Sequence, residues 1–225
     1  MSNAHQVTKD FEAALCEYTG APYAVAVSSC TAALTLAVGW GLKTPRHVSI
    51  GNFCDDNSRV MVVNNTVSSP KCTYVSVPQA IIHAGGRPVF RDEKWRGWYQ
   101  LEPLDVWDCA RLFTSGMYRS TSSYRGHMQC VSFHASKILG DTQGGAILHD
   151  NAEADAWFRR ARFDGRAEGV APKDDKGIIL GWHCYLSPDV SARLLMKLTA
   201  ANFPRHHEPL PNDAYPDLSL LECFK

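Results

Sequence analysis

Residues 131–149 have the sequence VSFHASKILGDTQGGAILH. An apolar, strand-like run ends at His134, Lys137 follows in a short loop, and a Gly–Gly pair opens a second apolar run. Lysine is rarely buried, because its ammonium group loses hydration inside a protein. Lys137 is therefore either a surface residue of a loop, as most lysines are, or a lysine held between two buried strands to react with a carbonyl group. The remainder of the chain discriminates between these interpretations.

The composition of the 225-residue chain is that of an ordinary globular protein, with 45% hydrophobic and 20% charged residues. The 23 Lys and Arg residues balance the 23 Asp and Glu residues, so the formal net charge is zero. This balance gives no electrostatic reason to expect a nucleic acid or an anionic membrane as a partner. No apolar run approaches the ~20 residues of a membrane-spanning helix, so no membrane partner is predicted.

The eight cysteines are scattered, without a CxxC pair or a regular spacing. A disulfide framework is typical of short secreted chains, and the polar start MSNAHQVTKDF (residues 1–11) does not resemble a signal peptide. We therefore expect reduced thiols and a cytoplasmic protein. No metal site is predicted.

Hydrophobic periodicity predicts helices and strands in alternation. Helices are expected at 6–19, 32–40, 74–86, 151–165 and 187–203. Strands are expected at 23–28, 59–63, 87–92, 104–108, 130–134 and 145–150. Polar loops are expected at 111–127 and 166–180, and an irregular, Pro-rich tail at 204–225. The alternation indicates an α/β fold with a mostly parallel sheet.

Ligands of such sheets bind where the strands end. Thr31, Asp108 and Lys137 all follow the ends of expected strands, which favours a functional role for each. The turn SSCT (28–31) lies between a strand and a helix, where backbone N–H groups point at an anion. The alternative is a plain helix cap formed by Ser29 or Thr31.

Seven motifs then occur in a fixed order. They are FEAALCEYTGAPYAVAVSSCTAAL (11–34), TYVSVPQAIIHAGGRPVF (73–90), VWDCAR (106–111), SFHASK (132–137), GGAI (144–147), RRARFDGR (159–166) and GWHCYLSPDVSA (181–192). This order resembles the DegT/StrS-type sugar aminotransferases, which are fold-type I pyridoxal-phosphate (PLP) enzymes, over about residues 10–200. The resemblance implies a three-layer sandwich, the large domain of these transferases, with the C-terminal small domain largely missing.

The resemblance also implies a domain organisation. Residues 1–203 would form the PLP-dependent transferase-like large domain, shortened near 92–104 and carrying an insertion near 43–71. Residues 204–225 would form the C-terminal tail. The chain is in this respect a compacted form of the family.

Two residues carry the chemistry that the resemblance implies. Lys137 matches the lysine that binds PLP covalently and then moves a proton, which needs an amine with a lowered pKa. Asp108 matches the acid that keeps the pyridine nitrogen protonated, so that the ring becomes an electron sink. Tyr74 matches the aromatic residue that stacks on the ring. Ser132 and Thr31 match hydroxyls of the phosphate site.

Three positions depart from the family pattern. Arg111 occupies the place of a His or Gln near the cofactor's 3-hydroxyl, and His183 aligns with an Asn that reaches the phosphate of the neighbouring subunit. A homodimer with shared active sites is therefore implied. Cys30 replaces the Gly of the family's phosphate turn, so either the turn is rearranged or the side chain points away. A thiol at the start of a helix is expected to have a lowered pKa, unless Cys30 is simply a small buried hydrophobe.

The resemblance implies a PLP-dependent aminotransferase that moves an amino group from an amino acid, expected to be glutamate, to a keto sugar, expected to be nucleotide-linked. Relatives that dehydrate sugars have a histidine in place of the lysine, so Lys137 favours transamination. One alternative is a PLP-binding protein without turnover. The other is a nucleotide-sugar-binding module that uses the same cleft without PLP.

Overall fold

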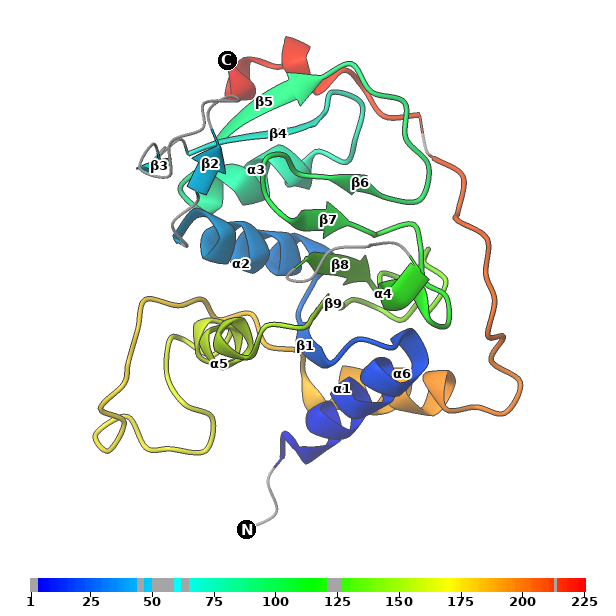
Figure 1. Ribbon diagram of the computed structural model, residues 1–225. Coiled ribbons are helices and arrows are strands. Elements are labelled where there is room, and N and C mark those ends of the chain that lie inside the picture. The colour runs from blue at the N-terminus through cyan, green and yellow to red at the C-terminus, as the bar shows by residue number, and fades with distance from the viewer. Residues whose placement is uncertain (1–3, 44–46, 50–58, 62–64, 121–126, 213) are drawn as a thin grey trace.

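The computed structural model describes residues 4–43, 47–49, 59–61, 65–120, 127–212 and 214–225. Its centre is a five-stranded sheet with the strand order β1-β9-β8-β7-β6 (Figure 1). The strands are β1 (Tyr23–Val27), β6 (Tyr99–Gln100), β7 (Val106–Asp108), β8 (Met128–Ser132) and β9 (Gly145–His149). Two smaller sheets pair β4 (Thr66–Pro70) with β5 (Arg87–Arg91), and β2 (His47–Ser49) with β3 (Arg59–Met61).

The central sheet is mixed, which corrects the expectation of a mostly parallel one. Among its described strands, β7 and β8 are parallel, whereas β9 is antiparallel to both of its neighbours and β6 is antiparallel to β7. The loop between β8 and β9 contains no helix, and without a crossover the chain returns antiparallel. Strands β1, β7 and β8 nevertheless run in one direction, so their carboxyl ends meet at the same edge.

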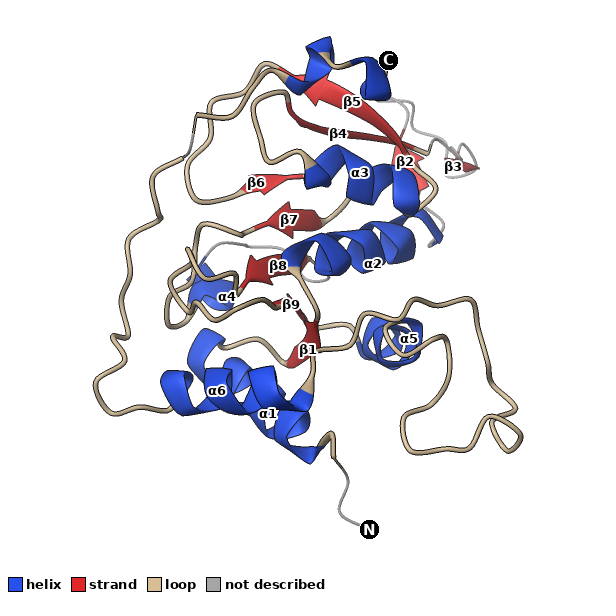
Figure 2. Cartoon of the chain, turned by 180° about the vertical axis from the view of Figure 1, so that it is seen from behind, coloured by secondary structure: helices blue, strands red, loops and turns tan. Residues whose placement is uncertain are grey.

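Helices cover both faces of this sheet, so the three-layer α/β fold is confirmed (Figure 2). One face carries α2 (Cys30–Lys43), α3 (Ser76–His83) and α5 (Ala152–Ala161). The other carries α1 (Gln6–Thr19), α4 (Met117–Ser120) and α6 (Pro188–Leu198).

The sequence of β1 explains why both faces are apolar. Val25 and Val27 enter the core under α2, while Ala24 and Ala26 enter the core under α1. Alternate side chains of a strand point to opposite faces. A strand covered on both sides therefore has the continuous apolar run that YAVAV shows.

The predicted helices are confirmed, with local signals at their ends. Helix α1 ends at Gly20, whose φ of 79° is left-handed and whose N–H donates to the Cys16 carbonyl. Helix α5 begins after Asn151, whose side chain accepts a hydrogen bond of 3.0 Å from the Ala154 N–H. Among the described residues, no helix is long and apolar enough to cross a membrane.

Several elements were not predicted. Strands β2, β4 and β6 are short or rich in Ser and Pro, so their local sequence does not favour a strand, and α4 interrupts the loop expected at 111–127. The expected strand 59–63 is present at Arg59–Met61, and its last two residues lie outside the described residues. Much of the expected insertion at 43–71 also lies outside them.

The segment 204–225 leaves α6 and returns across the molecule (Figure 1). It passes the loop that follows β7, where the Leu210 N–H donates to the Arg111 carbonyl at 2.9 Å. It then reaches β4 and β5, where the Leu218 N–H donates to the Lys71 carbonyl at 2.9 Å. The described residues of the tail are irregular apart from two short 3₁₀-helices, η1 (Leu218–Leu220) and η2 (Glu222–Phe224).

Candidate active site

A pocket of about 380 Å³ lies where β1, β7 and β8 end. Three parts of the chain build most of it: the turn before α2, the end of β7, and the loop between β8 and β9. The sequence placed candidate residues in each of these parts. Seven of them line the pocket: Cys30, Thr31, Tyr74, Asp108, Arg111, Ser132 and Lys137.

The Gly–Gly pair fixes the start of α2 against the sheet. A Cβ on Gly145 would lie 2.5 Å from both the Cys30 nitrogen and the Ser29 carbonyl carbon. Gly144 has a φ of +129°, which other residues rarely adopt. Glycine is therefore required here, because the turn before α2 and the start of β9 are in backbone contact.

Lys137 occupies a tightly wound loop and is half-buried. Its N–H donates to the His134 carbonyl at 2.8 Å, and a Cβ on Gly140 would lie 2.8 Å from the Lys137 carbonyl oxygen. The next acid, Asp141, pairs with Arg193 at 3.1 Å and with Lys197 at 3.2 Å. Helix α6 thus anchors the loop that carries Lys137, and the lysine lines the pocket instead of extending freely into solvent.

Asp108 is the buried acid of the pocket, with 6% of its surface exposed. Its Oδ1 accepts a hydrogen bond from the Ala110 N–H at 2.9 Å, and its Oδ2 accepts one from the Tyr99 hydroxyl at 2.6 Å. Burial raises the pKa of Asp108, while these two hydrogen bonds and the charge of Lys137 oppose the rise.

Tyr99 connects this acid to a second hydroxyl. Its oxygen lies 2.6 Å from the Thr73 Oγ1, and burial together with the negative charge of Asp108 raises the pKa of Tyr99 well above its ordinary value. The phenol therefore stays protonated and acts as a donor to the carboxylate.

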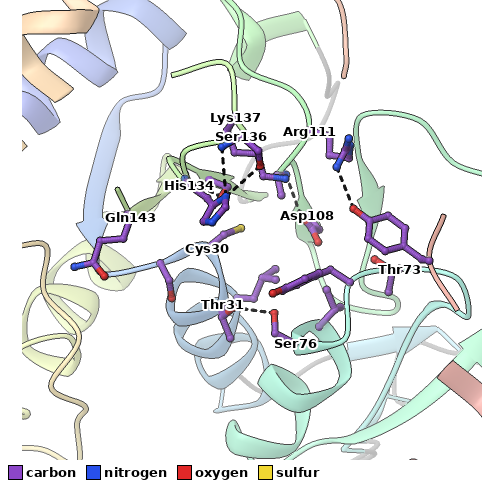
Figure 3. A pocket seen from close by; sticks show the side chains of 18 of the residues that line it. Cys30, Thr31, Thr73, Ser76, Asp108, Arg111, His134, Ser136, Lys137 and Gln143 are labelled. Carbon is purple, nitrogen blue, oxygen red and sulfur yellow. Dashed lines mark hydrogen bonds between the residues drawn. The ribbon is translucent and has the colours of Figure 1, made fainter. Parts of the chain in front are cut away.

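Hydroxyl groups gather at the start of α2. The Ser29 Oγ accepts a hydrogen bond of 3.0 Å from the Ala32 N–H, so Ser29 caps the helix while also lining the pocket. The Thr31 Oγ1 lies 2.8 Å from the Ser76 Oγ (Figure 3). The Ser132 Oγ accepts a weaker bond of 3.4 Å from the His134 N–H. A helix start with several hydroxyls is suited to an anion such as a phosphate.

Cys30 does not have the lowered pKa expected of a thiol at a helix start. Burial, followed by the negative charge of Asp108, raises the pKa of Cys30 well above its ordinary value. Its Sγ lies 3.7 Å from the Cys130 carbonyl oxygen and points toward the Asp108 side of the pocket (Figure 3). Cys30 thus packs as a small hydrophobe at the edge of the core.

The remaining candidates differ in exposure. Arg111 is buried, and its guanidinium donates to the Tyr215 hydroxyl at 3.1 Å and to the Pro211 carbonyl. Tyr74 is 60% exposed and lines the pocket. His183 does not line it: its exposed ring has Nδ1 3.0 Å from the Asp164 Oδ2, on a separate loop.

Other lining residues were not singled out from the sequence. Some had a signal, because they lie inside or beside a quoted motif: Thr73, Ser76, His134, Ser136 and Gln143. Trp95 and Tyr215, like Tyr99 behind Asp108, lie in segments to which the resemblance assigned no role. Tertiary contacts alone bring these three aromatic residues to the site.

Comparison with known proteins gives a family match over part of the chain and a similar fold. Residues 2–106 match the model of the DegT/DnrJ/EryC1/StrS aminotransferase family. A DegT DnrJ EryC1 StrS aminotransferase from Brucella abortus has a TM-score of 0.59 and 20% identity, over 85% of this chain and 58% of that chain.

Two further solved structures are similar. PseC of Helicobacter pylori, an aminotransferase involved in the biosynthesis of pseudoaminic acid, has a TM-score of 0.59 and 18% identity, over 90% of this chain and 64% of that chain. NtdA from Bacillus subtilis, with bound cofactor PMP, has a TM-score of 0.61 and 17% identity, over 85% of this chain and 47% of that chain. This chain therefore spans less than two thirds of each of the three proteins. In the sequence of residues 2–106 and in its fold, it resembles the DegT/DnrJ/EryC1/StrS aminotransferase family, over a shorter length.

Proposed function

We propose that this pocket binds PLP and that the protein is a PLP-dependent aminotransferase. One observation carries the proposal: a half-buried lysine, a buried carboxylate and a hydroxyl-lined helix start share one cavity. PLP needs an amine for its aldehyde, an acid for its ring nitrogen and donors for its phosphate. The residues present fit each of these three needs.

The residues have distinct roles in this proposal. Lys137 would hold the aldehyde carbon, Asp108 would hold the ring nitrogen, and Tyr74 would cover the ring. Thr31 and Ser132 would hold the phosphate as donors at the start of α2, in the pocket that Cys30 also lines. Arg111 would lie near the 3-hydroxyl.

When bound, PLP supplies an electron sink that lets the α-hydrogen of an amino acid leave as a proton. Asp108, in its ionised form, holds a proton on the ring nitrogen. Tyr99 stabilises that ionised form by its hydrogen bond to Oδ2. Lys137 would take the proton from the α-carbon of the amino-acid donor, hold it on its Nζ, and release it from the same atom to complete the transfer.

The substrates follow from the kind of protein that this chain resembles. We propose an amino acid, glutamate, as the amino donor and a keto sugar, linked to a nucleotide, as the acceptor. PseC of Helicobacter pylori, which is similar to this chain, is involved in the biosynthesis of pseudoaminic acid, and this supports a sugar as substrate. The alternative is a protein that binds PLP without turnover. It differs from the proposed aminotransferase in one measurable step, because its bound PLP would not react with glutamate.

The assembly and location belong to the same proposal. Residues 1–203 form the large domain and 204–225 a tail. We propose a homodimer in the cytoplasm, in which His183 reaches the phosphate of the partner's cofactor. The exposure of its side chain, 68%, supports this role, because the ring is accessible to a second subunit.

The test is an absorbance spectrum of the purified protein with PLP, before and after glutamate. We expect a visible band that borohydride abolishes, with the cofactor then found on Lys137 by mass spectrometry. Lys137→Ala should lose the adduct, whereas the exposed loop variant Lys173→Ala should keep it. An adduct that survives in Lys137→Ala would refute the assignment of this lysine. A band that glutamate does not change would favour the binding protein without turnover.

A further inference from the structure

The C-terminal segment returns to the pocket and touches its wall at several points. The Leu210 N–H donates to the Arg111 carbonyl at 2.9 Å, and the Asn212 side chain donates to the Trp95 carbonyl. A Cβ on Gly97 would lie 2.7 Å from the Pro209 Cβ, so the segment lies directly on that backbone. These contacts seat the segment against the loops that flank β6 and β7.

Tyr215 ends this run of contacts inside the site. Its ring stacks on the Trp95 ring, with centroids 6.0 Å apart and planes 17° from parallel. Both rings line the pocket. The wall of the cavity on this side is therefore formed by two stacked aromatic rings, one of them supplied by the C-terminal segment.

The same segment holds the guanidinium of Arg111. One terminal nitrogen donates to the Tyr215 hydroxyl at 3.1 Å, and the other donates to the Pro211 carbonyl. Arg111 is 8% exposed and lines the pocket, so its orientation is set by these contacts and not by solvent. A planar guanidinium that is held in place binds carboxylates with geometric specificity.

The charges of the pocket favour an anion. Two basic side chains, Arg111 and Lys137, line the cavity together with one acidic side chain, Asp108. In a half-enclosed site the surplus positive charge attracts a negatively charged ligand group more strongly than it would in water.

We propose that the C-terminal segment forms one wall of this binding site, and that Tyr215 is a specificity-determining residue. It closes the wall beside Trp95 and positions Arg111 to receive a carboxylate of the ligand. The proposal rests on the proposed function only for the choice of a carboxylate ligand, because the contacts of Tyr215 do not depend on PLP.

The test uses the full chain with and without PLP, and two probes of similar size. Glutarate carries two carboxylates, and glutaramide is its neutral counterpart. Tyr215→Phe keeps the ring and removes the hydroxyl that orients Arg111. By calorimetry we expect this substitution to weaken the binding of glutarate about tenfold, the equivalent of about 1.4 kcal/mol. The binding of glutaramide should be unchanged. Leu220 is an exposed residue of the same segment, so Leu220→Ala should change the binding of neither probe.

A double-mutant cycle tests whether Tyr215 acts through Arg111. Arg111→Lys keeps the charge but loses the planar fork, so combining it with Tyr215→Phe should add little further loss. The proposal is overturned if the unchanged protein does not bind glutarate, if Tyr215→Phe binds it normally, or if both probes weaken equally. A failure to take up PLP at Lys137 would count against the proposed function alone, since the probes are also measured without PLP.

Discussion

Tyr99→Phe tests how the buried acid of the pocket is stabilised. The substitution removes one hydroxyl, which donates to the Asp108 Oδ2 at 2.6 Å and contacts the Thr73 Oγ1. The ring keeps its volume, so the surrounding core is undisturbed. A hydrogen bond to a charged group contributes about 1.5–3 kcal/mol and a neutral one about 0.5–1.5 kcal/mol. The loss of unfolding free energy should therefore be larger by about 1 kcal/mol when Asp108 is ionised.

The sign of the pH dependence follows from the raised pKa of Asp108. Its ordinary value is 3.8, and the folded state binds the proton more tightly than the unfolded chain does. Stability from this group is therefore fully present below the unfolded pKa and falls as the pH rises through the folded one. Tyr99→Phe removes a bond that favours the carboxylate, so it raises the folded pKa further and deepens this fall.

Urea unfolding across a series of pH values measures both effects, and carbon NMR of the Asp108 carboxyl reports its pKa directly. Tyr18→Phe is a matched control, because the buried Tyr18 hydroxyl donates to the Pro204 carbonyl at 2.8 Å, a neutral acceptor. The control should lose stability by the same amount at every acidic and neutral pH. A constant difference between the unchanged protein and Tyr99→Phe across this range would refute the role of Tyr99.

Three further predictions concern the parts that hold the site together. Gly145→Ala should destabilise the protein by about 1–3 kcal/mol, measured by urea unfolding, because the added methyl group overpacks the site. Gly39→Ala is the control and should not destabilise the protein, because its Cβ would meet only ordinary contacts from 3.7 Å. Cys30 should react with iodoacetamide more slowly than the exposed Cys223, as followed by mass spectrometry; equal rates would contradict its raised pKa. Desolvation raises the pKa of Asp141, but hydrogen bonds from the loop of Asp141 and from α6 outweigh this effect and lower the pKa to about 2. Asp141→Asn should therefore be less stable than the unchanged protein at neutral pH, with the difference disappearing as the pH falls through that value.

The sequence predicts the elements whose signals are local. Helix α1 was predicted within its observed bounds because its apolar positions recur at helical spacing and Gly20 ends it. The antiparallel direction of β9 was not predicted. The sequence does contain a signal for it, because residues 134–145 have no helical pattern that could form a parallel crossover. Strand β4, with the sequence TVSSP, has little intrinsic preference for a strand and forms because β5 pairs with it.

The candidate site divides in the same way. Lys137 and Asp108 follow strand ends within compact motifs, so their position can be inferred from the sequence. Tyr99 and Tyr215 reach the site through contacts between segments far apart in the chain, and no spacing rule connects them to it. The pKa of Cys30 was predicted in the wrong direction, because the helix dipole is visible in the sequence and the extent of burial is not.

The environment of Lys137 favours a reactive residue over a solvated loop residue. A solvated lysine needs no fixed backbone, yet this loop is wound around Gly140 and fastened to α6 through Asp141. Lys137 is half-buried, and the carboxylate of Asp108 lies near enough for the charge of Lys137 to oppose the rise of the Asp108 pKa. Such an arrangement fixes the backbone of Lys137 at the pocket that its side chain lines. A lysine that reacts with a carbonyl group needs such positioning and a surface residue does not, which supports the proposed role of Lys137.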